Sequence, residues 1–197
     1  WQMDARTTPQ LATDKPRWTG QAAAQPLLLW GEQGIGDQIL YSSILPDLAN
    51  LPQKKYVALD KRLIPLYQRS MPQFEFLDLT RAAEAPDYAE HLPLGSLPPL
   101  FRPSQASFET ARHPYLVADA QRVAVLRQKA SRPDRLVCGV SWSSNRKGIG
   151  SHKSISLAQM LPPLASDRLH FVNLQYGDTS AERDALRAAH GIEVQNI

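Results

Sequence analysis

Two loops of this sequence combine small or hydroxyl residues with charged side chains, and each follows a short apolar run. The first runs from Gly31 to Asp37 with the sequence GEQGIGD. Glycines let a ligand approach the backbone closely, and the free N–H groups of a following helix can bind an anion. Asp37 is a candidate base for taking a proton from an acceptor hydroxyl. An aspartate at this place can also cap the helix, so both interpretations stay open.

The first loop fits neither of two known phosphate-binding patterns in full. Gly31 and Gly36 have the spacing of a P-loop, but Asp37 stands where that loop needs a lysine. The dinucleotide fingerprint needs a glycine where Ile39 stands, although Asp60 lies about where a ribose-binding acid could be. A P-loop is therefore disfavoured, and a nicotinamide-dependent enzyme is matched only in part.

The second loop, residues 143–154, contains three Lys or Arg residues, several hydroxyls and no acid. It follows an apolar run and precedes a helical pattern. Hydroxyl and N–H groups can bind the oxygens of a diphosphate there, while a lysine neutralises the charge of the leaving group. A solvated surface loop is the alternative.

Metal and cofactor ligands are not evident in the sequence. No D-x-D sequence occurs, the five histidines are scattered, and the single cysteine, Cys138, lies in an apolar run typical of a buried strand. We expect neither a metal nor a cofactor, so positive side chains and the helix dipole would have to balance any leaving charge.

Strand and helix patterns alternate along the chain and predict an α/β fold with a parallel sheet. Strands are predicted at 27–30, 56–60 and 74–77, with helices at 37–50 and 62–70 between them. Residues 82–114 are rich in proline and predict loops and short elements. In open parallel sheets, ligands bind beyond the carboxyl ends of the strands, where the first loop would lie.

A second unit of the same kind is predicted to follow. The expected elements are a helix at 118–130, a strand at 136–142, a helix at 157–166, a strand at 170–174, a helix at 181–190 and a strand from 192. We place the boundary near Pro133, which gives domains at 1–133 and 134–197. LPDLA at 45–49 is echoed by LPPLA at 161–165, which favours an internal repeat.

Composition narrows the class of protein. The net charge of +3 over 197 residues gives no reason to expect a nucleic-acid partner. No apolar run approaches the roughly 20 residues that span a bilayer, and the first residues lack a signal pattern. We therefore expect no transmembrane segment and a cytoplasmic location.

The segment from Leu27 to Asp37 resembles the E-Q-G-x-G-D segment of bacterial tetratricopeptide-repeat proteins that carry a glycosyltransferase domain. P-R-W-x-G at 16–20, G-V-S-W-S-S-N at 139–145 and N-L-Q-Y-G at 173–177 follow in the order of that family's landmarks. These proteins are related to heptosyltransferases and, more distantly, to protein O-GlcNAc transferases. The resemblance covers almost the whole chain. It implies a GT-B fold, with a Rossmann-like acceptor half and the beginning of a Rossmann-like donor half.

The resemblance also implies roles for individual residues. Asp37 would be the base near the acceptor, in a loop with Gln33, Gly34 and Gly36. Lys153 corresponds to the lysine that meets the diphosphate of the donor. The residues that would line the same nucleotide-sugar pocket are Ser143, Ser144, Asn145 and Gln175. The active site would lie in the cleft between the halves.

The implied activity is metal-independent transfer from a nucleotide-diphosphate sugar to an unknown glycan, lipid-linked or protein acceptor, with tetratricopeptide repeats on the N-terminal side. Two departures stand out: Ser144 replaces a common glycine, and residues 40–43 replace an aromatic-x-Arg-Tyr run. The family's D-T-x-x-A-H segment, which helps to hold the nucleotide, is expected beyond Ile197. We therefore expect this chain alone to transfer no sugar. A non-catalytic binding or scaffold module is the alternative.

Overall fold

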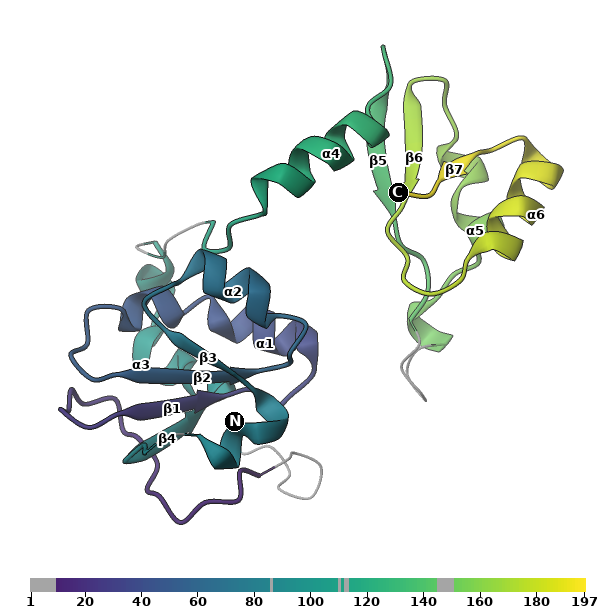
Figure 1. Ribbon diagram of the computed structural model, residues 1–197. Helices are drawn as coiled ribbons and strands as arrows, with labels where there is room; N and C mark the ends of the chain where they lie inside the picture. Colours follow the sequence, from purple (N-terminus) through teal and green to yellow (C-terminus); the bar gives the residue numbers. More distant parts are fainter. Residues whose placement is uncertain (1–9, 86, 110, 112–113, 145–150) are drawn as a thin grey trace. The chain divides into compact units, whose positions relative to one another are not determined.

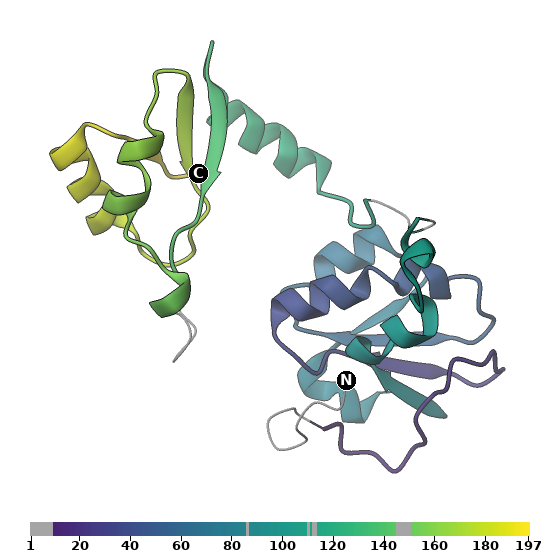
Figure 2. The same cartoon turned by 180° about the vertical axis from the view of Figure 1, so that it is seen from behind.

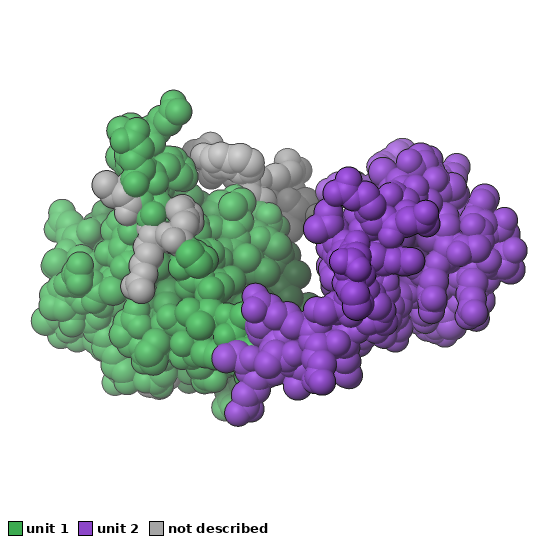
Figure 3. Space-filling model, turned by 90° about the horizontal axis from the view of Figure 1, so that it is seen from above, with its two compact units in different colours: residues 1–119 green, residues 120–197 purple. Residues whose placement is uncertain are grey.

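A computed structural model describes residues 10–197, apart from 86, 110, 112–113 and 145–150. Its contacts divide the chain into two compact units, 1–119 and 120–197 (Figure 3), and each is described by itself. Each unit contains one parallel sheet, so the predicted α/β class is confirmed.

The sheet of the first unit has the order β3-β2-β1-β4, and all neighbours are parallel. Its strands are β1 (Leu27–Trp30), β2 (Lys55–Leu59), β3 (Glu75–Asp78) and β4 (Glu90–Pro93). The chain moves outward from β1 to β3 and then returns to place β4 on the other side of β1. This reversal creates a switch point between β1 and β4, the place where open parallel sheets bind ligands.

Both faces of this sheet are buried. Helices α1 (Ile35–Ser42) and α2 (Ile64–Ser70) cover one face (Figure 1), where Leu27 and Leu29 pack into the larger core. Leu28 and Trp30 point to the opposite face, into a smaller core that includes the partly buried Leu79. Burial on two sides explains why β1 is a continuous apolar run without alternation.

The predicted helix at 37–50 consists of two elements. Helix α1 ends at Ser42, and a 3-10 helix, η1 (Leu45–Leu48), follows. Pro46 stands at the start of η1, because proline lacks the N–H that a continuing α-helix needs. The predicted helix at 157–166 divides in the same way into α5 (Leu157–Met160) and η6 (Pro162–Leu164).

Strand β4 lies in the segment where the sequence predicted loops and short elements. It pairs with β1 along its length, from Leu27 opposite Glu90 to Trp30 opposite Pro93. The segment before β1 covers the outer edge of β4, since Trp18 donates its backbone N–H to the carbonyl of His91 in β4 at 2.9 Å. Among the described residues between 94 and 119 the structure has only short elements: η3 (Leu94–Ser96), α3 (Pro98–Phe101) and η4 (Gln105–Phe108).

The second unit has the strand order β5-β6-β7, again parallel. Its strands are β5 (Leu136–Val140), β6 (Leu169–Asn173) and β7 (Val194–Gln195), and its longest helices are α4 (Ala120–Ala130) and α6 (Ser180–His190). Helices α5 and α6 cover one face of the sheet (Figure 2) around a core of Trp142, Leu157 and Phe171. Cys138 is partly buried against this core.

The domain boundary is predicted near Pro133, whereas the contacts within the chain divide it between Asp119 and Ala120. Helix α4 is the segment between these two positions. Hydrogen bonds fasten its C-terminal end to β7. The Gln195 amide donates to the Lys129 carbonyl at 3.1 Å and accepts from Arg132 at 2.8 Å. These contacts group α4 with the second unit.

None of the helices in the described part of the chain combines the length and the apolar composition needed to cross a lipid bilayer.

Candidate functional site

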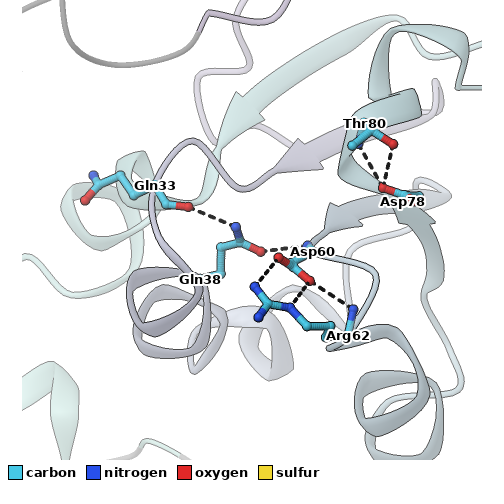
Figure 4. A network of polar contacts seen from close by, with 6 residues as sticks. All are labelled: Gln33, Gln38, Asp60, Arg62, Asp78 and Thr80. Carbon is cyan, nitrogen blue, oxygen red and sulfur yellow. Dashed lines mark hydrogen bonds and ion pairs between the residues drawn. The ribbon is translucent and has the colours of Figure 1, made fainter. Parts of the chain in front are cut away.

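The loop after β1 is held to the end of β2 by Gln38, a side chain of α1 that is only 4% exposed. Its amide donates to the Gln33 carbonyl at 2.9 Å and accepts the N–H of Asp60 at 2.8 Å (Figure 4). A Cβ on Gly31 would lie 2.6 Å from Cγ of Gln38. Glycine at position 31 is therefore required by the packing of Gln38, a reason that the sequence did not reveal.

On its other side the same loop is held by Glu32. Oε1 of Glu32 accepts the N–H of Gly95 at 3.0 Å, which joins the loop after β1 to the segment after β4 across the switch point. Burial raises the pKa of the Glu32 carboxyl. A Cβ on Gly95 would lie 2.3 Å from Oε1, so this contact excludes larger residues at position 95. No role is predicted for Glu32 from the sequence, where the available signal is an acid directly after a buried strand.

Two further carboxylates at the carboxyl edge of this sheet are bound by neighbours in sequence (Figure 4). Asp60 accepts from Nε of Arg62 at 2.9 Å and from its second guanidinium nitrogen at 2.8 Å. The side-chain hydrogen bonds from Arg62 lower the pKa of Asp60 to about 2. Asp78 accepts from the backbone and hydroxyl of Thr80 at 2.9 and 2.8 Å, and the pKa of Asp78 is lowered as a result. The Asp60 carboxylate is thus occupied by an arginine at the place considered for a ribose.

Asp37 differs from these carboxylates. It lies in the first turn of α1, whose N-cap is Gly34, and no side chain caps this helix. The predicted alternative, a capping role for Asp37, is therefore not the geometry observed. Its Oδ2 lies back toward Gly34, 3.4 Å from where a Cβ of that residue would be. Among the residues that the structure describes, no hydrogen bond or ion pair engages the Asp37 carboxylate, whereas Glu32, Asp60 and Asp78 each have a partner.

The other predicted residues of the first loop are Gln33, Gly34 and Gly36. Gly34 and Gly36 are exposed, and a Cβ on Gly36 would meet no atom within 4 Å. Gln33 is half-buried and lines a cavity with Glu32. Packing thus leaves space at Gly36 and at the side chain of Gln33, but not at Gly31.

In the second unit, Gln175 holds the loop after β5. Its Oε1 accepts hydrogen bonds from the Ser141 hydroxyl and from the backbone N–H groups of Trp142 and Ser143, each at 3.0 Å. The side chain is 7% exposed, and the N–H of Gln175 donates to Asn173 at 2.9 Å. The structure therefore brings Gln175 and Ser143 together, but the side-chain oxygen of Gln175 is engaged by the protein itself.

Two hydrogen bonds join the ends of the loop after β5, residues 143–156. Ser144 donates its N–H to the Ser154 hydroxyl at 2.9 Å, and Ile155 donates its N–H to the Trp142 carbonyl at 3.0 Å. Lys153 is the last residue of η5 (Ser151–Lys153), directly before Ser154, and its side chain is exposed. These two hydrogen bonds therefore bring together the two ends of the loop, which contain Ser143, Ser144 and Lys153. Asn145 lies outside the described residues.

Glu182, in the first turn of α6, also holds this loop. Its carboxylate accepts from Nε1 of Trp142 at 2.7 Å and from the N–H of Leu157 at 3.1 Å. One side chain therefore fixes the residue before the loop and the first residue of α5 after it. Glu182 is not predictable from local sequence, because its partners lie 25 and 40 residues away.

Each unit thus presents one loop beyond the carboxyl end of its first strand, held by buried or clamped amide and carboxylate groups. The loop of the first unit offers an acid that no other described residue engages, and that of the second offers serine hydroxyls and an exposed lysine. The described residues contain no group of three or more His, Cys, Asp or Glu side chains placed to hold a metal ion.

The chain is similar to Protein FlbA of Caulobacter vibrioides (strain ATCC 19089 / CIP 103742 / CB 15), with 28% identity over 198 residues. The similarity covers 90% of this chain, which spans only 33% of the length of that protein. No family model matches the chain, and no solved structure matches it. The comparison thus relates nearly all of the chain to one part of a longer protein whose name states no activity.

Proposed function

We propose that this chain is part of a GT-B glycosyltransferase that transfers a sugar from a nucleotide-diphosphate donor. The first unit would be its Rossmann-like acceptor half, and the second the beginning of its donor half. The shared parallel order of β3-β2-β1 and β7-β6-β5 supports the assignment of two related halves. The observation that carries the proposal is the Asp37 carboxylate, which stands at the carboxyl edge of the first sheet without a partner among the described residues.

In the proposed reaction the acceptor hydroxyl gives its proton to Asp37 while its oxygen bonds to the anomeric carbon of the donor sugar. The bond from that carbon to the diphosphate oxygen breaks, and the diphosphate leaves with the electron pair. Lys153 balances the leaving charge, and the hydroxyls of Ser143 and Ser144 bind phosphate oxygens. Glu32, Gln38 and Gln175 keep the two loops in place, so that little ordering is needed on binding.

The test is sugar transfer by the full-length protein that contains this chain, followed by release of the nucleoside diphosphate. Asp37→Asn keeps the shape of the side chain but cannot accept the proton, so turnover should fall about a hundredfold or more. Asp87→Asn is the matched control, because Asp87 is exposed and lies before the amino end of β4, whereas Asp37 lies beyond the carboxyl ends of the strands. Wild-type turnover in Asp37→Asn would remove Asp37 from the mechanism.

The donor side is tested by calorimetry with uridine, guanosine and adenosine diphosphate sugars. Lys153→Gln should weaken binding of the donor that the wild type accepts, whereas Lys129→Gln on α4 should not. If the full-length protein binds none of these donors, the chain is better described as a scaffold module. Binding of NADH in a fluorescence titration would instead support the nicotinamide-dependent alternative.

A further inference from the structure

A small cavity lies at the carboxyl end of β1, beside the loop that carries Gln33. Its volume is about 190 Å³. Leu11 and Leu79, which line it, pack against the core on the sheet face opposite α1 and α2. The cavity therefore lies beyond the carboxyl end of β1, on the sheet face opposite α1 and α2, and ligands of open parallel sheets bind beyond the carboxyl ends of the strands.

The walls of the cavity are of two kinds. Trp30, Leu11 and Leu79 give it an apolar side, and Glu32 and Gln33 give it a polar side. Oε1 of Glu32 already accepts the N–H of Gly95 at 3.0 Å and the amide N–H of Gln33 at 3.5 Å, but a carboxylate has about four acceptor positions and can bind further donors. The Gln33 amide can both donate and accept. A ligand here would meet an apolar surface on one side and hydrogen-bonding groups on the other.

Charge and size limit what the cavity can hold. The lining residues among those described include a carboxylate and no Lys or Arg, which disfavours a phosphate or a carboxylate ligand. The volume is below the about 300–1,000 Å³ typical of sites for drug-sized molecules, so it suits a single ring. A neutral ring with several hydroxyls would place its C–H face on the apolar wall and its hydroxyls on the polar wall.

We propose that this cavity binds one neutral hydroxylated ring, such as a pyranose, with Glu32 and Gln33 as its hydrogen-bonding partners. The inference rests on the proposed function and extends it, because it gives the acceptor a chemical class: a molecule that carries a sugar ring beside the hydroxyl to be glycosylated. Gln33 and Asp37 share one loop, which places ring recognition next to the proposed base in the sequence.

Saturation-transfer NMR with glucose, galactose, N-acetylglucosamine and rhamnose tests this directly. At least one should bind the protein with a Kd in roughly the millimolar range, since so few atoms gain little binding energy. Cyclohexanol, which lacks most hydroxyls, should bind about tenfold more weakly. Inorganic phosphate should not compete.

Two variants locate the binding. Leu79→Trp fills the cavity and should weaken sugar binding at least about tenfold, whereas Leu40→Trp adds the same indole at an exposed position of α1 and should leave it unchanged. Gln33→Ala removes an amide without filling space and should weaken binding about fivefold, which keeps the test valid if Leu79→Trp does not fold.

The proposal is overturned if no monosaccharide binds, if phosphate displaces the sugar, or if Leu79→Trp and Gln33→Ala bind like the wild type. Its failure is distinguishable from failure of the proposed function. Loss of transfer in Asp37→Asn without any monosaccharide binding removes only the cavity from the account. Monosaccharide binding with full transfer in Asp37→Asn removes only the base.

Discussion

The carboxylate of Glu182 accepts a hydrogen bond from the indole nitrogen of Trp142 at 2.7 Å. Its other oxygen accepts the N–H of Leu157 at 3.1 Å. Trp142 is buried in the core of the second unit, and Leu157 begins α5. One side chain of α6 therefore helps to hold both ends of the cationic loop, together with Gln175 and the hydrogen bond between Ser144 and Ser154.

Replacement of Glu182 by alanine should destabilise the second unit. Glu182→Ala removes two hydrogen bonds to a charged group; because Glu182 is exposed and water screens its charge, the free energy of unfolding should fall by only about 1–2 kcal/mol. Denaturant unfolding followed by tryptophan fluorescence measures this. Asp184→Ala, an exposed position of the same helix, is the control. Equal effects of the two changes would show that the bonds to Trp142 and Leu157 contribute nothing.

Two glycine substitutions should differ in cost although both create a close contact. A Cβ on Gly95 would lie 2.3 Å from Oε1 of Glu32, and one on Gly139 would lie 2.4 Å from Cδ1 of Leu174. Leu174 is 60% exposed and can turn away, whereas Glu32 is buried and hydrogen-bonded. Gly95→Ala should therefore cost about 2–3 kcal/mol, and Gly139→Ala less than about 1 kcal/mol. Thermal denaturation of both variants measures these losses. A larger loss of stability in Gly139→Ala than in Gly95→Ala would contradict the prediction.

Glu32→Gln should stabilise the protein at neutral pH. Burial raises the pKa of the Glu32 carboxyl in the folded state above its ordinary value of 4.5. Above pH 4.5 the unfolded chain therefore ionises more readily, and the wild type loses stability as pH rises through this window. Glutamine can still accept the N–H of Gly95 but carries no charge. The gain in melting temperature should grow above pH 4.5 and disappear below it, whereas Glu109→Gln, at an exposed position, should show no such gain.

His91 should make the first unit sensitive to mild acid. Nε1 of Trp30 donates to Nδ1 of His91 at 3.1 Å, which requires that nitrogen to be unprotonated. Burial, assisted by the charge of Arg17, lowers the pKa of His91 below 6.5 in the folded state. As pH falls below 6.5 the unfolded chain takes up the proton first, so the free energy of unfolding falls.

Urea denaturation between pH 7.5 and 5 measures this effect. His91→Gln should reduce the pH dependence of the free energy of unfolding, because glutamine does not titrate. His190→Gln, at the exposed end of α6, serves as the control for loss of a histidine. An unchanged slope in His91→Gln would contradict the assignment.

The sequence predicted the elements whose pattern is local. Leu27–Trp30 was predicted as a strand at its observed limits, and α6 was predicted to within one residue of its start. Strand β4 was not predicted, because it is four residues long, contains Glu90 and ends at Pro93. What makes it a strand is pairing with β1 on one side and with the segment around Arg17 on the other. That information is distributed over distant parts of the chain.

The candidate site was predictable in position and less so in detail. Loops after the first strand of a parallel unit are expected at its carboxyl edge, and both predicted loops lie there. Spacing could not decide between base and helix cap for Asp37, since the answer depends on Gly34 serving as N-cap. The roles of Gln38 and Gln175 in holding the loops could not be predicted either. The hydrogen-bond partner most distant in sequence lies 22 residues away for Gln38 and 34 residues away for Gln175.

The neutrality of Gln175 has an electrostatic consequence. A glutamate could accept the same three hydrogen bonds from Ser141, Trp142 and Ser143, and would hold the loop in the same shape. It would also place a full negative charge against the N–H groups of Trp142 and Ser143, where a segment begins whose charged residues are all cations. The neutral amide of Gln175 accepts these hydrogen bonds without adding a negative charge there.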